Sequence, residues 1–286
     1  MPKSPFQLFL PRCPTTSTVF ASPHSGCDYP DSMLARAQLD AVRIRSSEDA
    51  FVDRLFDAAP GAGAPFLVAR APRAFVDLNR APEELDPALI EGVRRGGHNP
   101  RIASGLGVVP RVVAGGQAIY RGKISLAEAQ ARLTNVWHPY HAALRGILDD
   151  TRRRFGAVTL IDCHSMPHEA IDAVAPAGQR RPDVVLGDRF GASASGDIVD
   201  AVEAAFVAAG LRVARNTPFA GAYIAQTYGR PAQNCHVIQV EIDRALYMDE
   251  ARIAPRADFA AFKATMDGIV AGLAAIGRRD VPLAAE

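Results

Sequence analysis

Short apolar segments alternate with longer amphipathic ones along this chain, and this alternation constrains the fold most. The strand-like segments lie at residues 18–21, 65–69, 74–78, 158–162, 184–186, 212–214 and 236–242. Helical spacing of apolar residues predicts helices at residues 49–58, 125–155, 197–209 and 259–276. Several strand-like segments are continuously apolar, which is typical of strands buried on both faces. The pattern predicts a three-layer α/β/α fold, in which a mixed, mainly parallel sheet carries helices on both faces.

The length of 286 residues allows two domains, but one α/β domain of this size is routine, and we expect a single domain over residues 1–286. Residues 93–122 are rich in Gly, Arg and Val and have no clear periodicity. Unpatterned segments of this length inside compact domains are usually functional or disordered. We therefore expect a long loop or lid there.

Charge and cysteine content limit the partners and the compartment. The net charge of +1 and the aromatic content of 7% give no basis for binding nucleic acid or an anionic membrane. There is no signal-peptide pattern and no apolar run near the roughly 20 residues that a membrane span needs. The four cysteines form no CxxC pair, which favours reduced thiols. We expect a cytoplasmic monomer or small homo-oligomer that acts on a small molecule.

Two histidines occupy matching positions after strand-like segments. His24 follows residues 18–21 and His164 follows residues 158–162, and a small polar residue and then a glycine or proline come soon after each. Side chains at the carboxyl ends of parallel strands point into the crevice where such sheets bind ligands. Neutral imidazole is a common zinc ligand, so the pair indicates half of a metal site. The alternative is that each histidine is hydrogen-bonded at a strand end without any ligand.

A second polar group follows the segment at residues 74–78. Asn79 and Arg80 lie on the turn that leaves it, and Arg73 lies at its other end. Arginine recognises carboxylates through a planar, two-pronged hydrogen-bond pair, which indicates an anionic substrate. The alternative is that Arg80 pairs with a structural acid such as Asp77.

The segment at residues 236–244 places a carboxylate inside an otherwise apolar strand. By a period of two, Glu241 shares a face with Val237, Gln239 and Asp243, while the other face is aliphatic. Polar groups in succession on one face are costly to bury unless that face lines a polar cleft. Apolar surroundings raise the proton affinity of a glutamate, which suits a general base. The competing interpretation is a salt bridge between Glu241 and Arg244.

Five motifs in order resemble one family. They are Ser-Pro-His-Ser-Gly at 22–26, Val-Asp-Leu-Asn-Arg at 76–80, Asp-Cys-His-Ser-Met-Pro at 162–167, Asn-Thr-Pro-Phe-Ala-Gly at 216–221 and Gln-Val-Glu-Ile-Asp-Arg at 239–244. Together they resemble the N-formylglutamate amidohydrolase family, related to the zinc carboxypeptidases and to the succinylglutamate desuccinylase and aspartoacylase group. The resemblance covers about residues 17–250. It implies a single-domain phosphorylase/hydrolase-like fold and one zinc ion per chain.

The resemblance also implies an activity, which is hydrolysis of the formyl or acyl amide of N-formyl-L-glutamate or a similar N-acyl acidic amino acid, as in histidine catabolism. It makes His24 and His164 metal ligands and Glu241 the catalytic base that activates a metal-bound water. It assigns the substrate carboxylate to Asn79 and Arg80. Arg73 and Arg244 complete the predicted substrate-binding set.

The third metal ligand departs from the carboxypeptidase pattern. Those relatives use a His-x-x-Glu motif, whereas Cys27 and Asp28 follow His24 here. An acidic residue before the following helix fits the formylglutamate family, and we favour Asp49 as this ligand, with Glu48 as the alternative. A structural interpretation is that Asp49 only caps the helix.

Two other functions remain open from the sequence. The first is a related zinc amidohydrolase or carboxypeptidase-like enzyme with a different acyl-amino acid or peptide substrate, because fold and metal do not determine the acyl group. The second is a metal-free protein that binds small carboxylates through Arg80. Metal content separates the binding protein from the enzymes, and substrate profiling separates the two enzymes.

Overall fold

A seven-stranded sheet forms the centre of the protein in this computed structural model, which describes residues 4–94, 99–172 and 181–278. The strands are β1 (Phe6–Phe9), β2 (Thr18–Ser22), β3 (Phe66–Ala69), β4 (Val158–Met166), β5 (Val184–Gly187), β6 (Val213–Arg215) and β7 (Cys235–Asp243). Their order across the sheet is β1-β3-β2-β4-β7-β5-β6. A separate two-stranded ribbon pairs β8 (Met248–Asp249) with β9 (Ala254–Pro255).

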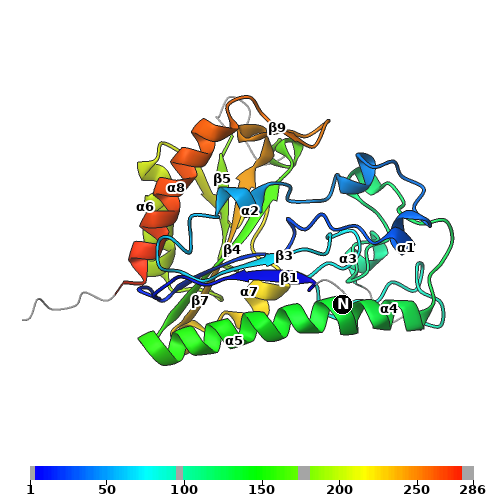
Figure 1. The fold of residues 1–286 in the computed structure, drawn as a ribbon, viewed down its shortest axis with the longest axis horizontal. Helices are drawn as coiled ribbons and strands as arrows, with labels where there is room; N and C mark the ends of the chain where they lie inside the picture. The colour runs from blue at the N-terminus through cyan, green and yellow to red at the C-terminus, as the bar shows by residue number, and fades with distance from the viewer. Residues whose placement is uncertain (1–3, 95–98, 173–180, 279–286) are drawn as a thin grey trace, which may run out of the picture.

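The sheet is mixed but mainly parallel. Strands β3, β2, β4 and β7 run parallel to one another, and β6 is parallel to β5. Strand β1 is antiparallel to β3, and β5 is antiparallel to β7. Helices cover both faces of this sheet (Figure 1). The predicted α/β class is therefore confirmed.

Four helices are long enough to shape the layers. They are α4 (Leu126–Arg132), α5 (His138–Phe155), α6 (Gly196–Ala208) and α8 (Phe259–Ile276). The short helices are α1 (Asp31–Leu34), α2 (Val52–Leu55), α3 (Pro100–Ala103) and α7 (Tyr223–Tyr228). Single turns η1 (Arg43–Arg45), η2 (Ala114–Gly116), η4 (His168–Ile171), η5 (Pro231–Gln233) and η6 (Arg244–Leu246) lie in the connections.

The period of two in the central strands separates two apolar cores. Val237 packs in the core that also contains residues of α5, whereas Ile238 and Val240 pack in the core formed with α2, α6 and α8. The polar side chains Gln239 and Glu241 share the face of Val237 but lie beyond the apolar part of that core, toward the carboxyl end of the strand. The predicted division of strand 236–242 into an aliphatic and a partly polar face is confirmed.

The predicted helix at residues 125–155 is continuous but contains a π-helical turn, η3 (Leu133–Trp137), between α4 and α5. Its start is capped, because the Ser125 hydroxyl accepts a hydrogen bond from the Glu128 backbone N–H at 3.1 Å. Gly156 ends the helix in the left-handed conformation with φ of 79°. Trp137 at the end of this wider turn donates through Nε1 to the Arg80 carbonyl at 3.0 Å, and π-helical bulges often occur at functional sites.

Two local predictions were wrong. Residues 74–78 form turns instead of a strand, because the Phe75 and Val76 backbone N–H groups bond back to the Pro72 carbonyl. The apolar residues Val76 and Leu78, which suggested a strand, are buried in the core. The helix predicted at 49–58 is reduced to α2, because Phe51 has a left-handed backbone with φ of 66°.

Helix α8 is apolar and 18 residues long, which is enough by length and composition to cross a membrane. Its buried residues Met266, Ile269, Val270 and Leu273 belong to the core that it forms with α6 and the sheet. Core helices of globular domains pass the same test of length and hydropathy, so this helix is weak evidence for a membrane span.

Candidate active site

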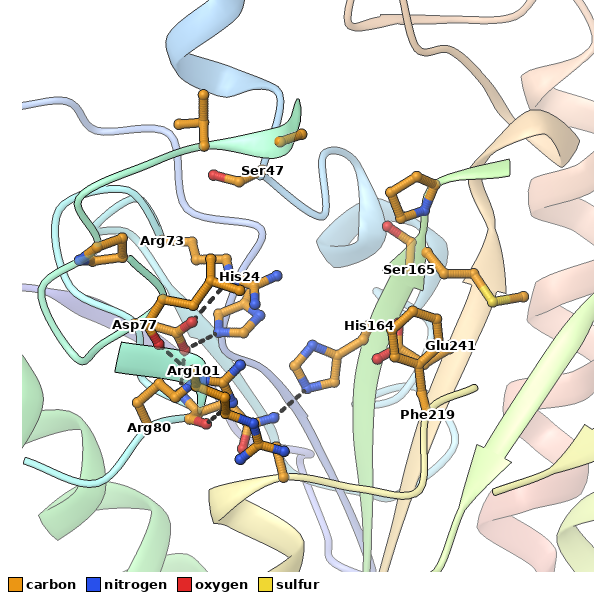
Figure 2. Close-up of a pocket in the computed structure, with 18 of the residues that line it drawn as sticks. His24, Ser47, Arg73, Asp77, Arg80, Arg101, His164, Ser165, Phe219 and Glu241 are labelled. Carbon is orange, nitrogen blue, oxygen red and sulfur yellow. Dashed lines mark hydrogen bonds and ion pairs between the residues drawn. The ribbon is translucent and has the colours of Figure 1, made fainter. Parts of the chain in front are cut away.

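The carboxyl ends of β2, β4 and β7 meet at one edge of the sheet, above a cavity of about 500 Å³. His24 follows β2, while His164 and Glu241 lie on β4 and β7 and are direct neighbours in the register of these strands. Strand β4 extends to Met166, so His164 lies within the strand and not after it as the sequence suggested. Figure 2 shows His24 with several arginines on one side of the cavity, facing His164 and Glu241 on the other.

His24, Asp49 and His164 form a compact group of donor atoms. One ligand atom from each lies within 4.8 Å of the other two, and all three side chains are buried. Asp49 Oδ2 is 2.9 Å from His164 Nδ1 and 3.5 Å from His24 Nδ1. Within the described residues, His24 Nδ1 is buried without a hydrogen-bond partner. The two imidazoles and the carboxylate form a donor set that can hold a metal ion. A metal ion would also give the buried His24 Nδ1 a partner.

Both imidazoles are fixed from the side away from this group. His24 Nε2 contacts Asp77 Oδ1 at 2.8 Å. His164 Nε2 lies 3.1 Å from Asp162 Oδ2 and 3.2 Å from Asn79 Nδ2. A carboxylate behind a histidine fixes the ring orientation and leaves the other nitrogen free to bind a metal, which is the usual arrangement of metal-ligating histidines. Burial by itself lowers the pKa of His164, but Asp162 and Asp49 outweigh it and raise that pKa well above its usual value, so positive charge is favoured here.

The two oxygens of Asp49 face different groups. Oδ2 faces the histidines, whereas Oδ1 accepts a hydrogen bond from Arg244 Nη2 at 3.0 Å. Arg244 in turn donates through Nε to the Ser165 hydroxyl at 3.2 Å and through Nη1 to the Ser46 carbonyl at 3.1 Å. The Asp49 backbone N–H donates to the His24 carbonyl at 3.0 Å. The carboxylate is thereby held at the histidines and does not cap α2.

The other candidates for the third ligand lie elsewhere. Glu48 accepts hydrogen bonds from Tyr29 at 2.6 Å and from Arg45 at 3.0 Å. Cys27 is exposed, and Asp28 pairs with Arg70 at 3.2 Å. Asp49 is therefore the acidic residue that the structure brings to both histidines.

We expect Asp49→Asn to weaken metal binding far more than Glu48→Gln, because only the first removes a charged oxygen from between the histidines. The measurement is metal content after dialysis against graded chelator, with both variants treated in parallel. Glu48→Gln serves as the control, because it removes a buried carboxyl charge one residue away. Equal metal retention by both variants would contradict the assignment of Asp49.

Glu241 is a buried carboxyl group whose pKa is raised by its surroundings. Burial raises the pKa of Glu241 to about 7, against the lowering effect of His164. Its Oε1 accepts a hydrogen bond from Gln239 Nε2 at 2.7 Å. Within the described residues, Glu241 forms no salt bridge with Arg244, because the Arg244 guanidinium pairs with Asp49. A carboxyl group with a pKa near neutrality beside a candidate metal site can accept and return a proton.

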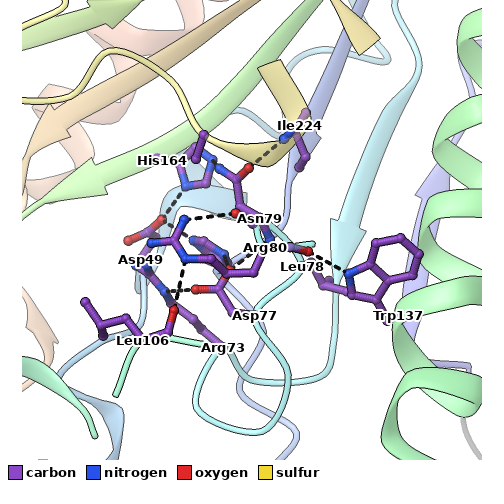
Figure 3. A network of polar contacts seen from close by, with 12 residues as sticks. Asp49, Arg73, Asp77, Leu78, Asn79, Arg80, Leu106, Trp137, His164 and Ile224 are labelled. Atoms are coloured by element: carbon purple, nitrogen blue, oxygen red, sulfur yellow. Dashed lines mark hydrogen bonds and ion pairs between the residues drawn. The ribbon is translucent and has the colours of Figure 1, made fainter. Parts of the chain in front are cut away.

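A chain of amides orients Glu241. Ile224 N–H donates to Asn79 Oδ1 at 2.8 Å, which directs Asn79 Nδ2 toward Gln239 Oε1 at 3.2 Å and His164 Nε2 (Figure 3). Gln239 Oε1 also accepts from the backbone of Ala222 at 3.0 Å, so its NH₂ group faces Glu241. The amide groups of Asn79 already have protein partners, and its predicted role in holding substrate stays a prediction.

Arg73 and Arg80 line the same cavity but differ in their hydrogen-bond partners. Arg73 Nε pairs with Asp77 Oδ2 at 3.1 Å. Arg80 donates to the backbone carbonyls of Leu106 at 3.2 Å and Asn79 at 3.0 Å (Figure 3). Among the residues that the structure describes, no carboxylate forms an ion pair with Arg80, so the pairing with Asp77 considered as an alternative does not form. The Arg80 guanidinium is held in place by neutral groups and keeps its charge available for an anion.

Some groups around the site were not predicted from the sequence. Asp162 Oδ2 lies 3.1 Å from His164 Nε2, and the period of two, which puts both residues on one face of the strand, could have indicated this. Arg101 of α3 and the turn at 112–116 also line the cavity. They belong to the predicted loop at 93–122, of which residues 95–98 lie outside the described residues. Without periodicity in that segment, the sequence could not single out Arg101.

The fold and the site together define an α/β protein with a polar, buried candidate site at the carboxyl edge of a mainly parallel sheet. The model of the family described as N-formylglutamate amidohydrolase matches residues 16–248. The chain therefore belongs to the N-formylglutamate amidohydrolase family, a family of hydrolases that act on an amide.

Individual relatives agree with this placement. The N-formylglutamate deformylase of Pseudomonas aeruginosa is 32% identical over 269 residues, which are 91% of this chain and 93% of that protein. The crystal structure of N-formylglutamate amidohydrolase from Ralstonia eutropha JMP134 matches with a TM-score of 0.90 and 35% identity over 98% of this chain and 100% of that one. A gene product of Agrobacterium tumefaciens, 17% identical with a TM-score of 0.59, shares the fold over 96% of each chain.

Proposed function

We propose that this protein is a zinc-dependent N-formylglutamate deformylase, which hydrolyses the formyl amide of N-formyl-L-glutamate or the acyl amide of a similar N-acyl acidic amino acid. The observation that carries the proposal is the buried group of His24, Asp49 and His164 beside Glu241. The names of the relatives from Pseudomonas aeruginosa and Ralstonia eutropha support the choice of substrate.

The donor set supports zinc as the metal. Two histidines and one carboxylate are a ligand set of catalytic zinc sites, which keep a further position open. The unpartnered His24 Nδ1 fits this use, because a buried polar atom without a partner is rare unless something else binds it. When bound here by His24, Asp49 and His164, zinc would supply Lewis acidity, which activates a water and stabilises negative charge on the amide oxygen.

The protein's own groups would perform the proton transfers. Glu241 is placed to take a proton from the attacking water and to deliver it to the leaving amine, and its raised pKa suits both directions near neutral pH. Gln239 and Asn79 hold the carboxylate in one orientation. The products of this reaction are formate and the free amino acid.

Substrate recognition in this proposal comes from the arginines. Arg80 would bind the α-carboxylate, since its guanidinium is fixed by carbonyl groups and has no anionic partner among the described residues. Arg73 would add positive charge beside the reacting amide while paired with Asp77. Arg244 was expected to bind substrate, and its bonds also give it the role of holding Asp49.

The test is a substrate profile combined with metal analysis. We expect zinc near one equivalent per chain, and the highest kcat/KM for N-formyl-L-glutamate among N-formyl and N-acetyl derivatives of glutamate, aspartate and methionine. Removal of the metal by a chelator should abolish formate release, and added zinc should restore it. A zinc-loaded protein that released no formate from N-formyl-L-glutamate would overturn the proposal, and a higher rate with another derivative would identify a related amidohydrolase.

Two broader expectations belong to the same proposal. We infer that residues 1–286 form one domain, because strands from both ends of the chain pair in one sheet. We also infer a cytoplasmic enzyme of histidine catabolism, for which the four free cysteines are consistent with a reducing compartment.

A further inference from the structure

Of the residues that the structure describes, four arginines line the cavity, and they differ in whether a carboxylate of the protein pairs with them. Arg73 and Arg244 each pair with a carboxylate of the site. Within the described ranges, neither Arg80 nor Arg101 has a carboxylate partner. Arg80 is 8% exposed, and a buried charge is normally paired, because leaving it unpaired is costly. The cavity therefore has two positive charges without a carboxylate ion pair among the described residues, and both are open to an anionic ligand.

Arg101 is held beside Arg80 by the start of α3. The Asn99 side chain caps this short helix and accepts a hydrogen bond from the Arg101 backbone N–H at 2.9 Å. Figure 2 shows Arg101 next to Arg80, on the wall opposite Glu241. Burial lowers the pKa of Arg80, and although the charge of Asp77 opposes this effect, the like charges of Arg73 and Arg101 add to it.

The two arginines lie at different depths of the cavity, and the two carboxylates of an acidic amino acid lie at different distances from its amide. Arg80 is buried near the metal-site histidines, whereas Arg101 is exposed at the outer part of the cavity. In an N-acyl glutamate the α-carboxylate is attached to the carbon next to the amide nitrogen, and the side-chain carboxylate lies two methylene groups further away. With the amide at Glu241, the nearer carboxylate would face the deeper arginine and the farther one the outer arginine.

We propose that Arg101 is a specificity-determining residue that binds the side-chain carboxylate of the substrate, while Arg80 binds the α-carboxylate. This inference rests on the proposed function, because it takes an N-acyl acidic amino acid as the substrate. Arg101 thus distinguishes glutamate derivatives from uncharged ones of similar length. Its contribution is a charge-assisted hydrogen bond made outside the reacting group.

Kinetics on two substrates test the assignment. We expect Arg101→Ala to lower kcat/KM for N-formyl-L-glutamate by about 10- to 100-fold, the usual range for a hydrogen bond to a charged group, and to leave N-formyl-L-glutamine little changed. Arg101→Lys should recover part of the loss, since it keeps the charge without the planar fork. Arg121→Ala is the matched control, because Arg121 is exposed on the same segment and does not line the cavity. Equal losses on both substrates, or no loss on either, would overturn the role of Arg101.

A binding measurement separates this inference from the proposed activity, because it requires no turnover. Isothermal titration calorimetry of the zinc-loaded protein compares glutarate with pentanoate, which has one carboxylate on the same carbon chain. We expect tighter binding of glutarate by the wild type and by Arg121→Ala, and loss of this preference in Arg101→Ala. A preference that Arg101→Ala retains, or its absence from the wild type, would overturn the assignment whether or not the protein hydrolyses N-formyl-L-glutamate.

Discussion

Glu241→Gln is expected to lose at least 10²- to 10⁴-fold in kcat, the usual contribution of a positioned general base, while the protein keeps its metal and binds substrate. The amide is nearly the same shape as the carboxylate, and its oxygen can still accept the hydrogen bond from Gln239. It cannot accept a proton from water. Because the same group would also serve the leaving amine, both proton transfers are lost together.

The measurement is steady-state kinetics on N-formyl-L-glutamate with zinc quantified in parallel. Glu169→Gln is the matched control, since Glu169 is exposed on η4 and does not line the cavity. Arg80→Ala should instead raise KM and change kcat little, because it removes a contact to the substrate carboxylate. Turnover of Glu241→Gln within a few-fold of wild type would remove Glu241 from the role of base.

His24→Ala and His164→Ala are each expected to lose metal and activity together while the protein stays folded. Each variant removes one of three ligands, which should lower metal affinity by more than the roughly 10- to 100-fold that follows loss of a residue behind a ligand. His24 and His164 lie at the edge of the sheet beside the cavity, so truncation enlarges the cavity and leaves the two apolar cores intact.

Metal content, circular dichroism and formate release are measured on the same preparations. His138→Ala is the control, because His138 is exposed on α5 and outside the cavity. Asp77→Asn extends the comparison, since it alters the group behind His24 and should cause a smaller loss of affinity than His24→Ala. Near-stoichiometric zinc in either histidine variant would remove that residue from the ligand set.

The sequence located strands β4 and β7 because a buried parallel strand must be apolar on both faces, and any polar residue in it is conspicuous. Glu241 is conspicuous in this way, whereas His164 was predicted just past its strand, and the register makes the two neighbours. The turns at residues 74–78 misled the prediction, because apolar residues such as Val76 and Leu78 can be buried without belonging to a sheet. A pattern of apolar residues indicates which side chains are buried. The backbone hydrogen bonds determine whether those residues form a strand or a turn.

The choice among Cys27, Asp28, Glu48 and Asp49 depended on tertiary contacts. Glu48 and Asp49 are adjacent and equally acidic, so local sequence cannot separate them. The left-handed backbone at Phe51 shortens the following helix, and the Asp49 N–H bond to the His24 carbonyl turns that side chain toward the histidines. Glu48 points instead to Tyr29 and Arg45.

The sequence by itself determined the α/β architecture and the residues able to carry chemistry, because both follow from local patterns of burial and polarity. It also determined the family, through five motifs in order. Only the tertiary structure decided which carboxylate joins the two histidines and which arginines keep an unpaired charge. Those properties depend on distances between segments far apart in the chain, such as Arg244 to Asp49, and one-dimensional spacing does not encode these distances.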